Sequence, residues 1–164
     1  MSRYQQEYHL KASILAEPAA VYGRLTDFAS LQQIVPNIVH AQGPDGPFTV
    51  GTQWHETRNL LFLRPALHLE VTDVQPLRIQ WVLRDGHAAF TYTFSLLPSL
   101  STGTTDVLCD VLCTVSYGGT AAARLACFMQ QKDSELLQRL KHLLEQGPAA
   151  DFSSRPGSGP VAVC

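Results

Sequence analysis

The chain has few charged side chains and no excess of either sign. Only 16% of its 164 residues are Asp, Glu, Lys or Arg, and 12 basic against 14 acidic residues leave a formal net charge of −2. Proteins that bind nucleic acid neutralise phosphates with clustered Lys and Arg side chains. The sequence therefore predicts no nucleic-acid partner.

Metal-binding and cofactor motifs are also lacking. The four cysteines form no CxxC pair and have no histidine at metal-ligand spacing, which zinc and redox motifs require. His55 and His68 could meet on neighbouring strands, but two ligands without a third are not typical of a metal site. Because G-x-S-x-G, Walker and G-x-G-x-x-G patterns are absent as well, we expect no metal and no cofactor.

Long apolar runs are missing. No stretch approaches the roughly 20 apolar residues needed to cross a bilayer, and the opening MSRYQQEYHLKAS lacks the apolar segment of a signal peptide. We expect a cytoplasmic protein without integral membrane association. Monomer and homodimer both remain open.

Alternation of apolar and polar residues is the dominant pattern that is present. It predicts a first strand over 8–15, followed by two short helices over 17–26 and 28–34, with Pro18 suited to the first helical turn. A series of further strands follows, over residues 38–41, 50–60, 66–74, 78–84, 88–97 and 105–116. The loops between them are short and rich in Pro and Gly, so neighbouring strands should be antiparallel.

The period changes to that of a helix over 120–146, where leucines, Phe128 and Met129 form one stripe. This helix should cover the apolar face of the sheet, because no other element is long enough. We therefore predict one α+β domain over 1–146, a curved antiparallel sheet wrapped around a long C-terminal helix and enclosing an apolar, ligand-sized cavity. Residues 147–164 have no period and should form a disordered tail.

Three stretches resemble the START-like superfamily, also called SRPBCC, and within it the polyketide cyclase/dehydrase-like group. They are VGTQWHETRNL from Val50, LEVTDVQPLRIQWVL from Leu69 and TYTFSLLPSLSTGTT from Thr91. The resemblance implies the helix-grip fold, with two short helices after the first strand, and a cavity for lipids, quinones or polyketides. Polyketide aromatase/cyclases of the superfamily look similar in having Trp and Arg at the spacing of Trp54 and Arg58, with a small residue in place of Glu56.

Polar residues on the inward face are the candidate site. Trp54, Glu56 and Arg58 share one face of a strand, and Trp54 favours the interior for that face. Glu56 and Arg58 then either form a structural ion pair near the cavity mouth, the interpretation we favour, or bind a ligand, with Tyr92 as a further polar contact. The expected ligand-binding residues are Trp54, Glu56, Arg58, Leu69, Trp81, Phe90, Tyr92, Phe94, Leu125 and Met129.

Three functions are compatible with this sequence. The first is a binding protein for a small hydrophobic molecule, held between sheet and helix. The second is a polyketide cyclase, aromatase or dehydratase in which Arg58, Glu56 and Tyr92 supply acid–base help. The third is a chaperone-type interaction module that acts through the outer sheet face, whose polar character argues against it.

Overall fold

The computed structural model describes residues 3–60 and 63–146. In chain order the elements are β1 (Tyr4–Ile14), α1 (Pro18–Leu25), α2 (Phe28–Ile34), β2 (Ile38–Gln42), β3 (Gln53–Arg58), β4 (Ala66–Gln75), β5 (Arg78–Arg84), β6 (Ala88–Pro98), β7 (Thr105–Val115) and α3 (Thr120–Gln146). This order confirms the one expected from the sequence. The tail and the two residues between Leu60 and Leu63 lie outside the described residues.

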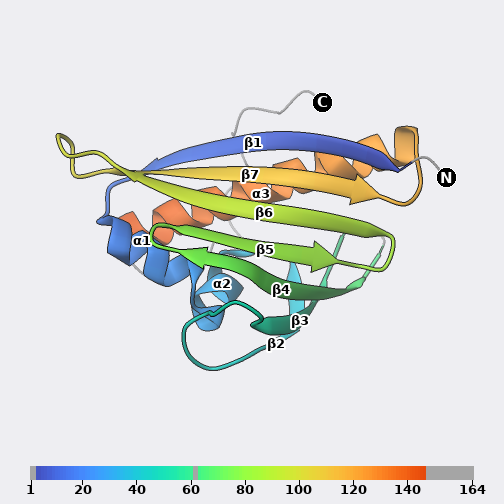
Figure 1. Ribbon diagram of the computed structural model, residues 1–164, viewed down its shortest axis with the longest axis horizontal. Helices are drawn as coiled ribbons and strands as arrows, with labels where there is room; N and C mark the ends of the chain where they lie inside the picture. The colour runs from blue at the N-terminus through green and yellow to red at the C-terminus, as the bar shows by residue number, and fades with distance from the viewer. Residues whose placement is uncertain (1–2, 61–62, 147–164) are drawn as a thin grey trace.

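The strands form one antiparallel seven-stranded sheet in the order β1-β7-β6-β5-β4-β3-β2. Strand β1 is an edge of the sheet and pairs with β7, so the first and last strands in sequence are neighbours. The sheet curves around α3, which crosses behind it, while α1 and α2 lie at the end where α3 finishes (Figure 1). The helix-grip architecture predicted from the sequence is confirmed.

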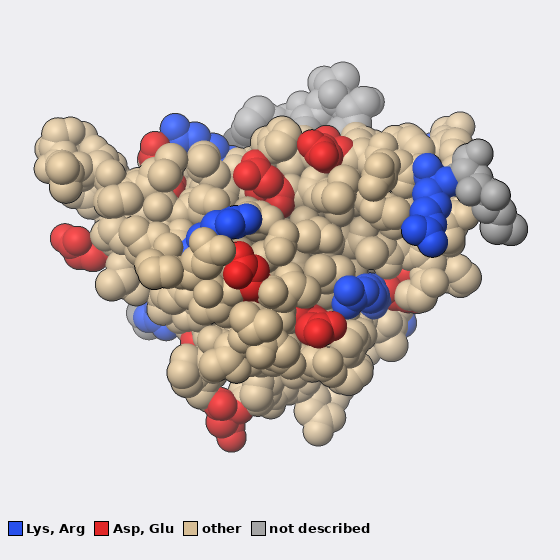
Figure 2. Space-filling model, in the orientation of Figure 1, with Lys and Arg blue, Asp and Glu red and all other residues tan. Residues whose placement is uncertain are grey.

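The two faces of the sheet differ as the alternation predicted. Inward residues such as Val71 and Trp81 are buried, whereas the outer face carries dispersed ion pairs, among them Lys11 with Asp106 at 3.1 Å. Charges of both signs are scattered over this face without a single-sign patch (Figure 2).

The two short helices position one end of the core. Asp27 caps α2, because its carboxylate accepts a hydrogen bond from the Ser30 backbone N–H at 2.9 Å. The capped helix packs against α3 and buries Leu31 and Ile34.

The strand predicted over 50–60 is shorter than expected. A turn precedes β3, in which the Thr52 N–H donates to the Thr49 carbonyl at 3.0 Å and Gly51 has φ of +90°. After Arg58, the backbone of Leu60 pairs instead with that of Leu63. The positive φ of Gly51 and the turn at Leu60 limit the strand to Gln53–Arg58, although Gly51 and Thr52 still form backbone hydrogen bonds with Val71 of β4.

Candidate functional site

Strand β3 carries a buried ion pair. Glu56 and Arg58 point inward with Trp54, and their side chains are only 3% and 6% exposed. The Arg58 Nε–H donates to Glu56 Oε1 at 2.5 Å, and a second guanidinium nitrogen contacts the same oxygen. The pair favoured from the sequence is present, but it lies in the interior rather than at a mouth.

A second buried polar group lies on α3. Asp133 is buried, and its two carboxylate oxygens accept hydrogen bonds from Tyr8 on β1 at 2.5 Å and from Tyr92 on β6 at 3.1 Å. Both tyrosines are cross-strand partners of Val111 on the intervening β7. They are thus two strand spacings, about 10 Å, apart, and the helix carboxylate bridges them.

Burial and charge set the ionisation of these groups. Burial raises the pKa of Asp133 to about 6, although the Tyr8 hydrogen bond, the Arg58 charge and the Tyr92 hydrogen bond act against it. Burial also raises the pKa of both tyrosines, so their hydroxyls remain donors. Burial alone would lower the pKa of Arg58, but Glu56, through its charge and its hydrogen bond, together with Tyr92 and Asp133 outweighs burial, so the pKa is raised. Two carboxylates and one guanidinium therefore share the interior.

These groups border a small interior cavity. It has a volume of about 10 Å³, which is room for about one water molecule. Its lining comprises Leu31, Val35, Trp54, Glu56, Arg58, Leu69, Trp81, Tyr92, Asp133 and Leu136. Six of the ten residues predicted to bind a ligand lie here, but the space they enclose is smaller than the ligand-sized cavity expected from the sequence.

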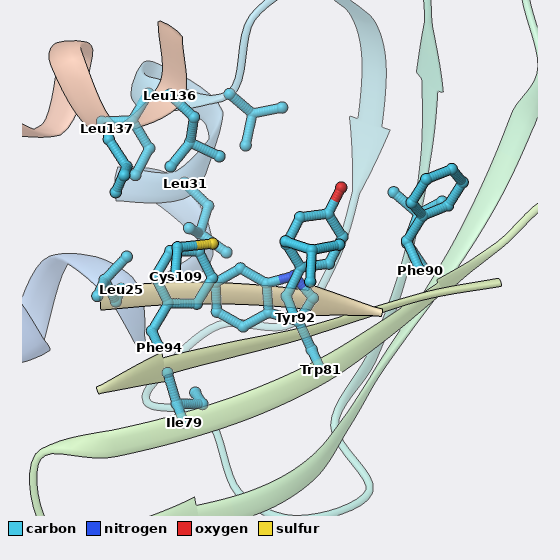
Figure 3. Packing of buried hydrophobic residues seen from close by; sticks show 14 of the residues in the cluster. Leu25, Leu31, Ile79, Trp81, Phe90, Tyr92, Phe94, Cys109, Leu136 and Leu137 are labelled. Atoms are coloured by element: carbon cyan, nitrogen blue, oxygen red, sulfur yellow. The ribbon is translucent and has the colours of Figure 1, made fainter. Parts of the chain in front are cut away.

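Aromatic packing accounts for the small volume. Trp81 lies 4.7 Å from Phe94 and 6.1 Å from Trp54 between ring centroids, and Trp54 stacks on Phe48 at 4.9 Å. Leucines of α2 and α3 pack against these aromatic side chains from the helix side (Figure 3). Phe90, Phe94 and Met129 of the predicted set are likewise buried in the hydrophobic core.

A larger pocket opens between the β3–β4 connection and the first half of α3, and we term it the α3 pocket. Its volume is about 590 Å³. It is lined by Leu60, Leu63, Pro65, Asp85, Tyr117, Thr120, Ala121, Arg124, Leu125 and Phe128. Leu125 is the predicted ligand-binding residue that lies in it.

Asp133 and Tyr8 were not among the predicted site residues, although the pattern contained a signal for both. Asp133 falls on the apolar stripe of α3, four residues after Met129 and three before Leu136. Tyr8 shares its face of β1 with the inward Ala12. A lone carboxylate on a buried stripe requires partners, and here inward tyrosines from two strands supply them.

The outer-face histidines do meet. The rings of His55 and His68 are cross-strand neighbours with centroids 4.8 Å apart. In the described part of the chain, no group of three or more His, Cys, Asp or Glu side chains is placed to hold a metal ion. Among the helices of residues 3–60 and 63–146, none is both long and apolar enough to cross a bilayer.

A curved antiparallel sheet that grips one long helix is the fold of START-like proteins. Residues 5–145 match the family described as polyketide cyclase / dehydrase and lipid transport, and the chain belongs to this family. No curated protein sequence matches the chain significantly.

Solved structures confirm the fold. An aromatase/cyclase from Streptomyces sp. R1128 is similar with a TM-score of 0.70 and 10% identity, over 90% of this chain and 100% of that one. A START superfamily protein from Mycobacterium smegmatis has a TM-score of 0.69 and 15% identity, over 85% of this chain and 97% of that one. At these identities the likeness concerns the fold.

Proposed function

We propose that the chain binds a small hydrophobic molecule, such as a lipid, quinone or aromatic polyketide, in the α3 pocket. The volume of about 590 Å³ carries this proposal, because small-molecule sites measure about 300–1,000 Å³ and are mainly apolar. Leu60, Leu63, Leu125 and Phe128 supply the apolar walls. The family description, which includes lipid transport, supports the same conclusion.

Ligand screening by thermal unfolding and native mass spectrometry tests the proposal. A ligand at one hundred times its Kd stabilises by about 2.7 kcal/mol, which is a rise of roughly 5–10 °C in Tm for a domain of this size. Leu63→Asp should abolish the rise, because Leu63 lines the pocket yet is 70% exposed and the substitution leaves the core intact.

Leu100→Asp is the matched control. Leu100 is fully exposed at the tip of the β6–β7 hairpin, at the opposite end of the sheet from the start of α3 (Figure 1). It should bind ligand like the unaltered chain. Equal binding by the Leu63 and Leu100 variants would place the ligand elsewhere, and no binding of any lipid, quinone or polyketide would refute the function.

A second candidate function, cyclisation or dehydration of a poly-keto chain, is favoured by the polar cluster. Asp133 has a pKa of about 6, which suits proton transfer near neutral pH. Its carboxylate would take a proton from a carbon between two carbonyls. The enolate carbon would then attack a further carbonyl of the same chain, and the new alkoxide would regain the proton. Arg58 would donate a hydrogen bond to the developing oxyanion, and Tyr92 could do so once its hydroxyl turns away from Asp133.

This reaction requires the substrate to advance from the α3 pocket towards the cluster. Asp133 follows Phe128 by five residues of helix, about 8 Å along the axis, and the buried Met129 lies between them in sequence. Turnover of a synthetic poly-keto substrate by folded Asp133→Asn, Arg58→Ala and Glu56→Gln variants tests the assignment. Unchanged turnover in all of them would refute it.

A further inference from the structure

The α3 pocket contains one basic side chain among its apolar walls. Arg124 lines the pocket and is exposed, and none of the ion pairs or side-chain hydrogen bonds between described residues involves its guanidinium. By contrast, three other basic residues of α3 form ion pairs with glutamates of the same helix; they are Lys132, Arg139 and Lys141. Arg124 therefore faces the pocket with its hydrogen-bonding capacity available.

The acidic group of the pocket has another role. Asp85 Oδ1 accepts hydrogen bonds from the backbone N–H groups of His87 at 2.8 Å and Ala88 at 2.7 Å, and so holds the turn between β5 and β6. No ion pair joins Asp85 to Arg124 among the described residues. The first turn of α3, which contributes Thr120 and Ala121 to the lining, contains no acidic residue, so the positive end of the helix adds a smaller field of the same sign as Arg124.

From this charge arrangement, and resting on the proposed function, we infer that the ligand of the α3 pocket is a single-chain amphiphile with a carboxylate head. Its alkyl chain packs against Leu60, Leu63, Leu125 and Phe128, and its carboxylate accepts hydrogen bonds from the Arg124 guanidinium. A guanidinium presents two parallel donors that match the two carboxylate oxygens. An alcohol or ester of the same length fills the same walls but brings no charge for Arg124.

Isothermal titration with dodecanoate, dodecanol and methyl dodecanoate at pH 7.5 and low salt tests the inference. The unaltered chain should bind dodecanoate about 1.4- to 5-fold more tightly than the two neutral ligands, since a partly exposed ion pair contributes about 0.2–1 kcal/mol. High salt should reduce this preference, because it screens exposed charges. Binding of the neutral ligands should not weaken with salt, because salt does not screen the burial of apolar surface.

Variants then assign the preference to its residue. Arg124→Gln should abolish the preference for the acid and leave the Kd for dodecanol unchanged. Asp85→Asn, which keeps the oxygen that accepts the turn hydrogen bonds, should strengthen the preference by removing a nearby negative charge. Arg78→Gln changes charge equally on the outer sheet face and is the control.

The outcomes separate the inference from the function on which it rests. If acid and alcohol bind equally to the unaltered chain, or if Arg124→Gln keeps the preference, the carboxylate inference is wrong while hydrophobic binding stands. If none of the three ligands binds, single-chain amphiphiles are excluded from the α3 pocket and the inference fails. The broader function is then judged by the screen of quinones and polyketides.

Discussion

Ionisation of Asp133 should make the stability of this protein depend on pH in one direction. Its pKa is raised from 3.8 to about 6 in the folded chain, so the folded state holds this proton more tightly than the unfolded state. Protonated Asp133 contributes fully to the stability of the folded state below about pH 4, and this contribution is lost as the pH rises through 6. A rise of about two pKa units corresponds to about 3 kcal/mol in the free energy of unfolding.

Asp133→Asn isolates this contribution. The amide cannot ionise, and its oxygen can still accept a hydrogen bond from Tyr8 or Tyr92. Other groups titrate in both proteins, so the informative quantity is the difference in unfolding free energy between the unaltered chain and the variant. Between pH 4 and pH 8, urea unfolding should show the unaltered chain losing about 3 kcal/mol of stability relative to Asp133→Asn. The difference should reach a plateau above about pH 7.

Glu7→Gln is the matched control, because Glu7 is an exposed carboxylate on β1 beside Tyr8. It should change the free energy of unfolding little, because the Glu7 side chain is exposed. A difference between the unaltered chain and Asp133→Asn that stays constant from pH 4 to pH 8 would refute the reasoning. Burial would then not disfavour the charge of this carboxylate.

Three further predictions concern the interior. Arg58→Met leaves the Glu56 carboxylate buried without its cation, and urea unfolding should show a loss of about 3–5 kcal/mol. Adding Glu56→Leu should restore much of it, and a double variant no more stable than the single one would contradict this account. Tyr92→Phe removes a hydrogen bond that lowers the pKa of the helix carboxyl, so carbon NMR should show its midpoint at higher pH, and an unchanged midpoint would mean that the bond is not made. Gly43→Ala places a Cβ 2.7 Å from ring carbons of the buried Phe28; the clash should cost about 1–3 kcal/mol, and an unchanged Tm would show that the ring moves freely.

The sequence predicted the fold well because sheet and helix each bury a single continuous face. Period-2 alternation identified the buried sides of β4 to β7, and the change of period identified α3 at its observed bounds. The error at β3 arose where local turns compete with the ladder. Alternation continues to Val50, but Gly51 adopts a φ of +90° within a turn closed by Thr52 and Thr49, and the strand begins only after this turn.

The candidate site was only half predictable, since a face assignment gives the direction of a side chain and not the space around it. Glu56, Arg58 and Tyr92 were identified because polar groups on an inward strand face are conspicuous. The partnership of Asp133 with two tyrosines depends on how α3 is rotated over the sheet, which no single element encodes.

Cavity volume is harder still to predict, because it is a small difference between the space under the helix and the side chains that fill it. The indole of Trp54 and the neighbouring Trp81 point into that space, and replacing either ring by a smaller side chain would change the remaining volume by far more than the 10 Å³ that is left. The same fold can therefore enclose a ligand or exclude one through a few aromatic positions. In this chain the aromatics fill the centre, and a pocket large enough for a ligand lies instead along the first half of α3, beside Arg124.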